Sequence, residues 1–169
     1  MKTLALLDLE ETIIESFNDA LILEGNIRKI TRFLKDVVGD FTDPDNVTDN
    51  LRFNWMSWAI WGWSEEECEL VDDVMTVLNR DHSWDMRSRL WMNMGLSMEW
   101  WVDALMRCEG LHVERQEIPH IFTKVDVLLK TRSLFENLDR VMLFDDTVEH
   151  GLTIRSKHCT IEFHNIKEM

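Results

Sequence analysis

Two short apolar runs near opposite ends of the chain each lead into acidic residues. The first run begins at Leu4 and ends at Asp8, and Glu10 follows two positions later. The second run leads directly into Asp145 and Asp146. Short apolar runs are typical of buried strands, and ligands bind beyond the carboxyl ends of strands in open α/β folds. These acids are therefore expected to converge at one edge of a sheet, where they would suit a hard cation and a phosphate.

The pattern of the whole chain indicates an α/β fold. Segments with strand character lie at residues 3–8, 51–60, within 111–122, 140–144 and 160–163. Segments with helical spacing lie at residues 27–38, 65–78, 84–107, 125–137 and 148–154. Because strands alternate with helices, right-handed crossovers should build a Rossmann-like three-layer sandwich with a mainly parallel sheet. Ser64 and Glu67 have the spacing of a capping box, which should begin the second helix.

Length and composition bound the class of protein. With 169 residues, 45% of them hydrophobic, the chain is expected to fold as a single domain over residues 1–169. No apolar run approaches the roughly 18 residues of a membrane span, and the N-terminus lacks the features of a signal peptide. The three cysteines are odd in number and show no metal-ligand spacing, which indicates reduced thiols. We therefore expect a cytoplasmic protein without a membrane segment.

The formal net charge of −14 narrows the expected partners. Proteins bind a nucleic-acid backbone through a basic surface, so this charge disfavours nucleic acid as a partner. A small phosphorylated substrate remains compatible with the charge, because a metal ion can supply positive charge locally.

The order of the motifs resembles that of the haloacid dehalogenase (HAD) superfamily of phosphohydrolases. The first family motif is an apolar strand followed by Asp-x-Asp-x-Thr, and here it stands as Asp8-Leu-Glu10-Glu-Thr12. The fourth motif is an acidic pair after an apolar strand, here Asp145-Asp146. The two motifs together are more specific than either acidic pair alone, which could be an ordinary strand end or turn.

The two middle motifs of the family are single residues and are less specific. The second motif is a Ser or Thr at the end of the next strand, and Ser57 is the candidate, with Thr123 as its rival. The third is a Lys at the start of the helix before the last acidic strand, and Lys124 fits it. An ordinary strand serine and a solvated lysine at a helix end are the alternative interpretations.

The resemblance implies the mechanism of a phosphatase. Asp8 would attack phosphorus and form an aspartyl-phosphate, while Ser57 and Lys124 bind the phosphoryl oxygens. Glu10 would protonate the leaving oxygen and then activate water. The family usually has Asp at this position. The extra methylene of Glu shifts the carboxyl by roughly a bond length, and a misplacement of this size can lower the rate about 10²-fold.

The resemblance also implies a cofactor and a substrate. Mg²⁺ would be held by the carboxylates of Asp8 and of Asp145 or Asp146. The backbone carbonyl of Glu10 would be a further ligand. The first expected substrate is a nucleoside monophosphate. The chain also looks like small nucleotidases and like the phosphatase part of bacteriophage polynucleotide kinases, and this likeness makes nucleic acid with a 3′-phosphate the second expectation. A nucleic-acid 3′-phosphatase and a non-catalytic HAD-like binding or regulatory protein are the alternatives.

A tryptophan-rich segment occupies residues 55–101, which contain all eight tryptophans of the chain. Most of them are expected in the core, and the rest could form a stacking wall for a base or a surface for a partner. Trp58, Trp61 and Trp63 are the best candidates for stacking, because they follow Ser57 at the edge of the predicted sheet that carries the acids. This middle part of the chain is longer than one crossover needs, so a small helical insertion is expected over residues 80–107, between the second and third strands.

Overall fold

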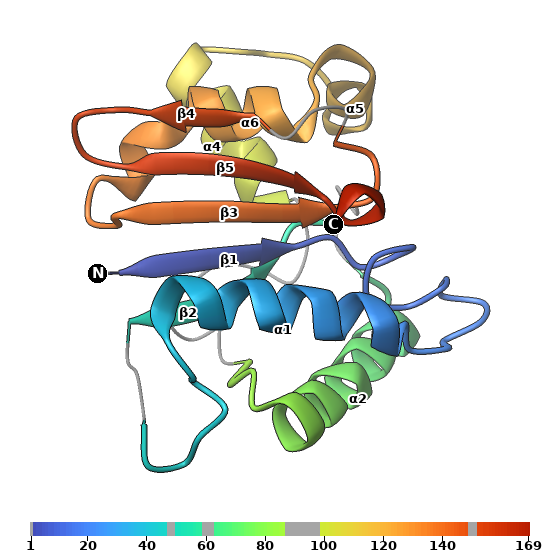
Figure 1. Ribbon diagram of the computed structural model, residues 1–169. Coiled ribbons are helices and arrows are strands. Elements are labelled where there is room, and N and C mark those ends of the chain that lie inside the picture. The colour runs from blue at the N-terminus through green and yellow to red at the C-terminus, as the bar shows by residue number, and fades with distance from the viewer. Residues whose placement is uncertain (1, 47–49, 59–62, 87–98, 149–151) are drawn as a thin grey trace.

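The computed structural model describes residues 2–46, 50–58, 63–86, 99–148 and 152–169. Within them, five strands form one sheet in the order β2-β1-β3-β5-β4 (Figure 1). The strands are β1 (Thr3–Leu7), β2 (Leu51–Trp55), β3 (Arg140–Asp145), β4 (Thr153–Arg155) and β5 (Thr160–Asn165). Strands β2, β1, β3 and β5 are parallel, and β4 pairs antiparallel with β5 at the edge. The mainly parallel sheet expected from the sequence is confirmed.

Helices cover both faces of this sheet, as Figure 1 shows. The α-helices are α1 (Glu24–Val38), α2 (Glu65–His82), α4 (Glu99–Glu109), α5 (Ile118–Ile121) and α6 (Lys124–Lys130). Short 3-10 helices are η1 (Arg115–Glu117), η2 (Arg132–Phe135) and η3 (Ile166–Glu168). Because strand side chains alternate between faces, Ala5 packs in the core cluster with α1 and α2, whereas Leu4 and Leu6 pack with α4 and α6. The protein therefore has the α/β architecture with a layer of helices on each side of the sheet.

Capping boxes define where two of the helices begin. The Ser64 hydroxyl accepts a hydrogen bond from the backbone N–H of Glu67, and the Glu67 carboxylate accepts one from the N–H of Ser64, as predicted. Thr123 and Asp126 make the same pair of hydrogen bonds at the start of α6. The second box makes Lys124 the first residue of α6 and so sets its place beside the sheet.

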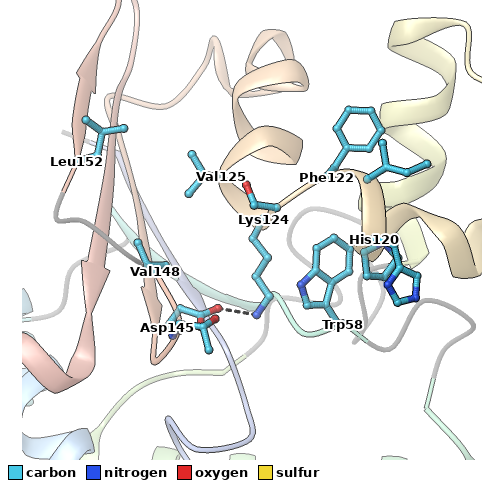
Figure 2. Close-up of a pocket in the computed structure, with 12 residues that line it drawn as sticks. Trp58, His120, Phe122, Lys124, Val125, Asp145, Val148 and Leu152 are labelled. Carbon is cyan, nitrogen blue, oxygen red and sulfur yellow. Dashed lines mark hydrogen bonds and ion pairs between the residues drawn. The ribbon is translucent and has the colours of Figure 1, made fainter.

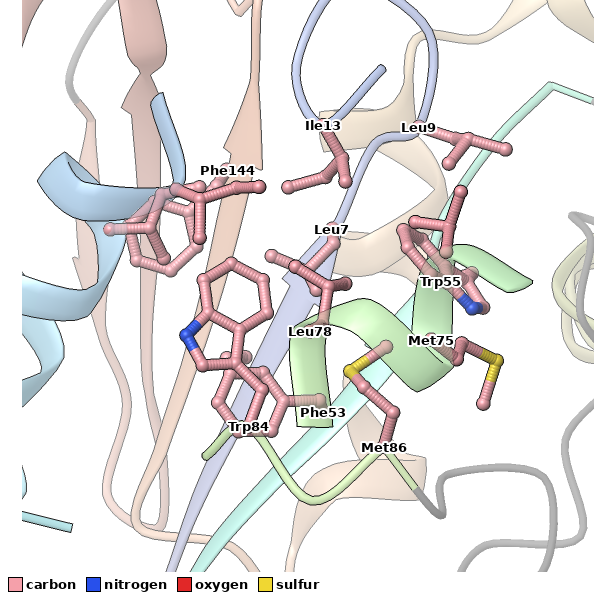
Figure 3. Packing of buried hydrophobic residues seen from close by; sticks show 14 of the residues in the cluster. Leu7, Leu9, Ile13, Phe53, Trp55, Met75, Leu78, Trp84, Met86 and Phe144 are labelled. Carbon is pink, nitrogen blue, oxygen red and sulfur yellow. The ribbon is translucent and has the colours of Figure 1, made fainter. Parts of the chain in front are cut away.

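Aromatic side chains fill the space between α2 and the sheet (Figure 3). The rings of Trp84 and Phe53 stack with their centroids 5.1 Å apart, and the Nε1–H of Trp84 donates to the hydroxyl of Thr31 over 2.8 Å. Trp55, Trp84 and Trp101 are all fully buried. These three tryptophans belong to the core, which is the place expected for most of the tryptophan-rich segment.

Two of the predicted elements are wrong. The strand predicted within residues 111–122 is replaced there by η1 and α5. Pro119 lies in the first turn of α5, where a residue without an N–H leaves no helical hydrogen bond unmade. The helix predicted over residues 148–154 conflicts at its end with β4, in which Ile154 lies opposite Ile161 of β5, and residues 149–151 lie outside the described part of the chain. Short apolar patterns suit either type of element, and here pairing with β5 decides the outcome.

The middle of the chain differs in its boundaries. The strand predicted over residues 51–60 ends at Trp55. Of the insertion expected over residues 80–107, the first residues complete α2 and the last belong to α4, which packs on the sheet. Residues 87–98 lie outside the described part of the chain. No helix that the structure describes is both long enough and apolar enough to span a membrane.

Candidate metal and phosphate site

The strands bring the predicted acids to one edge of the sheet. Asp8 follows the last residue of β1, and Asp145 is the last residue of β3. The two strands are parallel neighbours, with Leu7 opposite Phe144. The backbone N–H of Asp8 continues the pairing by donating to the carbonyl of Phe144 over 3.0 Å. The acids are therefore close together because the strands end in register.

Lys124 joins these acids from α6. Its Nζ donates to Oδ1 of Asp8 over 2.8 Å and to Oδ2 of Asp145 over 2.6 Å, and Figure 2 shows the second contact. Only 7% of the Lys124 side chain is exposed. Burial would lower the pKa of this ammonium, but the charges of Asp8 and Asp145 outweigh burial and raise that pKa. Lys124 is therefore a permanently charged bridge between the ends of β1 and β3.

Hydrogen-bond donors occupy some of the remaining carboxylate oxygens. The hydroxyl of Thr12 donates to Oδ2 of Asp8 over 3.2 Å. The N–H and hydroxyl of Thr147 donate to Oδ1 of Asp145 over 2.9 and 2.8 Å, so both oxygens of Asp145 have donors. The buried Oδ2 of Asp146 has no hydrogen-bond partner among the described residues. A buried carboxylate oxygen without a donor is costly unless a cation or another donor meets it.

The three carboxylates have the geometry and chemistry of a cation site. Oxygens of Asp8, Asp145 and Asp146 all lie within 4.8 Å of one another, and all three residues are buried. Hard cations such as Mg²⁺ and Ca²⁺ prefer carboxylate oxygens. Among the described residues, the ammonium of Lys124 pairs with Asp8 and Asp145 but not with Asp146, so a divalent cation would offset the negative charge that remains in the cluster. The Oδ2 oxygen of Asp146, which has no hydrogen-bond donor among the described residues, is suited to bind such a cation.

The cluster also perturbs the protonation of its members. Burial raises the pKa of Asp8 to about 7, helped by the charge of Asp145 and opposed by Lys124. Burial would likewise raise the pKa of Asp146, but the interactions of its carboxylate with the side chains of Asp8 and Glu11 outweigh burial and lower that pKa. Without a cation, Asp8 therefore takes up a proton near neutral pH. Bound cations favour the ionised form of their ligands, so metal binding would release this proton.

Ser57 lies at the same edge of the sheet, two residues after β2. Strand β2 is the parallel neighbour of β1, and the N–H of Met56 donates to the carbonyl of Leu7 over 2.7 Å. Ser57 is buried, and its hydroxyl makes no hydrogen bond within the described ranges. Its rival Thr123 uses its hydroxyl to cap α6. Ser57 is therefore the hydroxyl of the two that remains available to a ligand.

The second acid of the first motif lies differently from the buried cluster. Glu10 is exposed, and its carboxylate makes no hydrogen bond or ion pair with any described residue. The next residue, Glu11, has a left-handed backbone with φ 62°. A hydrogen bond with Asp146, together with the charge of that residue, raises the pKa of Glu11. The acid in contact with the cluster is thus Glu11, which the sequence interpretation missed because only the backbone turn reveals it.

A cavity of about 430 Å³ opens beside Lys124 (Figure 2). Trp58, one of the three tryptophans predicted as a stacking wall, lines this cavity. Trp63 packs instead against the core cluster that contains α1 and α2. Trp61 lies outside the described residues. The cavity therefore gives the cluster an adjoining space in which a ligand could lie.

No protein-family model, curated protein or solved structure matches this chain, so the chemistry of the site is inferred from its own residues. The site combines a buried carboxylate nucleophile candidate, Asp8, with an ammonium at 2.8 Å. Two further carboxylates and a buried serine complete the set. Such a set can hold a divalent cation and the anionic oxygens of a ligand side by side.

Proposed function

We propose that this protein is a Mg²⁺-dependent phosphatase that hydrolyses a small phosphate monoester, with a nucleotide as the expected substrate. One observation carries the proposal. Asp8, Lys124, Asp145 and Asp146 form one buried cluster at the carboxyl edge of a parallel sheet. The resemblance of the motifs to the HAD superfamily supports the same activity.

In the proposed first step, a carboxylate oxygen of Asp8 attacks phosphorus and forms an aspartyl-phosphate. The bond between phosphorus and the ester oxygen breaks, and its electron pair goes to the leaving oxygen. The ammonium of Lys124 and the hydroxyl of Ser57 offset the charge on the phosphoryl oxygens. Glu10, whose carboxylate is not engaged by another described residue, gives a proton to the leaving oxygen.

In the second step, Glu10 takes a proton from water, and the resulting hydroxide attacks the phosphorus of the aspartyl-phosphate. The acyl–phosphate bond breaks, Asp8 is regenerated and inorganic phosphate leaves. Thr12 holds the Asp8 carboxylate in place through its hydrogen bond of 3.2 Å. If Glu10 is the acid and base, Glu10→Gln should lose more activity than Glu11→Gln. The carboxyl of Glu11 interacts with Asp146 and is therefore not assigned to proton transfer.

Asp8, Asp145 and Asp146 are the residues proposed to hold Mg²⁺, with the backbone carbonyl of Glu10 as a further ligand. When bound, Mg²⁺ would neutralise part of the negative charge that phosphate brings to the carboxylates. Mg²⁺ keeps several waters in its octahedral shell, so this small number of protein oxygens is sufficient.

The proposal is tested by measuring phosphate release from purified protein with Mg²⁺ or with EDTA. The panel contains nucleoside monophosphates, sugar phosphates and 3′-phosphorylated oligonucleotides. Asp8→Asn should abolish release, whereas Asp19→Asn, in an exposed aspartate of the same loop, should not. If no substrate gives more release than with Asp8→Asn, the phosphatase proposal is wrong and a binding protein remains. A clear preference for oligonucleotides that disappears with added salt would identify a nucleic-acid 3′-phosphatase.

A further inference from the structure

The cavity beside Lys124 lies next to the proposed phosphate site and opens to the protein surface. Its volume of about 430 Å³ suits one small ligand. The described residues that line it are Trp58, Pro119, His120, Ile121, Phe122, Thr123, Lys124, Val125, Asp145, Thr147, Val148 and Leu152. Because Lys124 and Asp145 belong to both the cavity and the buried cluster, a phosphate bound at the cluster would place the rest of its ester in this space.

The walls of the cavity are aromatic and aliphatic. Figure 2 shows the rings of Trp58, His120 and Phe122 on one side of Lys124. Val148 and the neighbouring Leu152 lie on the other side. Aromatic side chains bind flat rings by stacking, and the contact tolerates different bases because each base has a π face. A flat ring is therefore the ligand group that such walls would favour.

The charges in the cavity limit the number of phosphates that it can bind. Among its described lining residues, the full charges are those of Lys124 and Asp145, and these two pair with each other over 2.6 Å. At the mouth, Ile121 and Leu152 are apolar and 53% and 45% exposed. A second phosphate group placed in this space would lose its hydration without gaining an arginine or lysine partner from the described lining.

We propose that this cavity binds the leaving group of the substrate and selects a flat heterocyclic ring attached to a single phosphate. The preferred substrate class is then a nucleoside monophosphate. Sugar phosphates, nucleoside diphosphates and 3′-phosphorylated oligonucleotides are poor substrates or ligands. This inference rests on the proposed function, because that function places the phosphate at Lys124.

A matched pair of substrates tests the selection of a ring. A nucleoside 5′-monophosphate and ribose 5-phosphate release the same primary alcohol and differ in the base. The value of kcat/KM should be higher for the nucleotide by between about fivefold and 150-fold, as expected for one base–aromatic stack. A second pair, a nucleoside 3′-monophosphate and a 3′-phosphorylated dinucleotide, tests the limit of one phosphate. Equal kcat/KM values within both pairs would overturn the inference.

Variants of the cavity wall test which residues make the selection. Trp58→Leu, Phe122→Leu and Leu152→Ala should each reduce the ratio of the two kcat/KM values in the first pair. Leu134→Ala is the matched control for Leu152→Ala, because it is a leucine of similar exposure, 40%, that does not line the cavity. Leu152 is an exposed side chain, so its variant keeps the test valid if Trp58→Leu does not fold. A ratio that none of the wall variants changes contradicts the inference.

Binding measurements separate this inference from the phosphatase proposal. Asp8→Asn protein is titrated calorimetrically with a nucleoside monophosphate, the corresponding diphosphate and ribose 5-phosphate. Tighter binding of the monophosphate, weakened by Phe122→Leu in the same background, supports the cavity assignment even if the wild type hydrolyses nothing. Hydrolysis without any preference for the nucleotide in rate or binding refutes the cavity assignment and leaves the phosphatase proposal standing.

Discussion

Replacing Asp8 with asparagine should make the metal-free protein more stable at neutral and alkaline pH, although it removes the proposed nucleophile. Asp8 is 8% exposed, and burial is the largest cause that raises its pKa. Asparagine has nearly the same shape as the protonated carboxyl and carries no charge. The variant therefore keeps the folded arrangement without requiring a buried ionised group at this position.

The size and the sign of the effect follow from the pKa of Asp8. A rise from 3.8 to about 7, at about 1.4 kcal/mol for each pH unit, corresponds to roughly 4 kcal/mol. Because the pKa of Asp8 is higher in the folded protein than in the unfolded chain, the protonated carboxyl stabilises the folded state. This contribution to the free energy of unfolding is complete below pH 3.8. The contribution is lost as the pH rises through about 7. Asp8→Asn should thus match the wild type near pH 4 and exceed it by roughly 4 kcal/mol above pH 8.

Urea denaturation in EDTA at several pH values between 4 and 8.5 measures this difference in the free energy of unfolding. Glu15→Gln, in an exposed acid of the same loop, is the control and should follow the wild type. Mg²⁺ should stabilise the wild type more than Asp8→Asn, because the variant lacks one proposed ligand. If the difference between Asp8→Asn and the wild type does not grow with pH, burial does not raise the pKa of Asp8.

Three further perturbations test other contacts by urea denaturation. Lys124→Met should lower the free energy of unfolding by about 3–5 kcal/mol at pH 8, because the buried carboxylates of Asp8 and Asp145 lose their cationic partner. An unchanged value would show that Lys124 does not stabilise these carboxylates. Thr31→Val should cost about 1–3 kcal/mol, because the buried Nε1–H of Trp84 loses its acceptor, and wild-type stability would show that this bond contributes nothing. Burial lowers the pKa of His164 from 6.5, so the free energy of unfolding should fall as the pH drops below 6.5. His164→Gln should remove this part of the pH dependence. If the dependence persists in His164→Gln, another group causes it.

Much of the candidate site could be predicted from the sequence, because its residues sit next to elements that are locally encoded. Asp8 and Asp145 end short apolar strands, and the neighbouring Thr123 caps the helix that Lys124 begins. Each of these signals spans only a few residues, so no knowledge of distant contacts is needed to recognise it. The position of Ser57 after an aromatic strand predicts its place, and the parallel pairing of β2 with β1 brings it to the same edge.

The parts that could not be predicted depend on contacts between distant segments. Strand β4 has only three residues, Thr153 to Arg155, which is too short for a recognisable pattern in the sequence, and its pairing with the edge of β5 makes it a strand. The apolar residues of segment 111–122 suggest a strand, but the segment forms the short helices η1 and α5 over residues 115–121. Glu11 reaches Asp146 through a left-handed backbone turn at a residue type that seldom adopts one.

The sequence by itself determined the α/β class, the parallel strands and the acids that follow them, because these features depend on periodicity and on neighbours along the chain. Only the tertiary structure decided that Lys124 bridges Asp8 and Asp145, and that the buried cluster adjoins a cavity lined by Trp58. These are contacts between segments that lie far apart in the sequence. Their distances are decided by how the helices pack on the sheet, and local patterns in the sequence do not contain that packing.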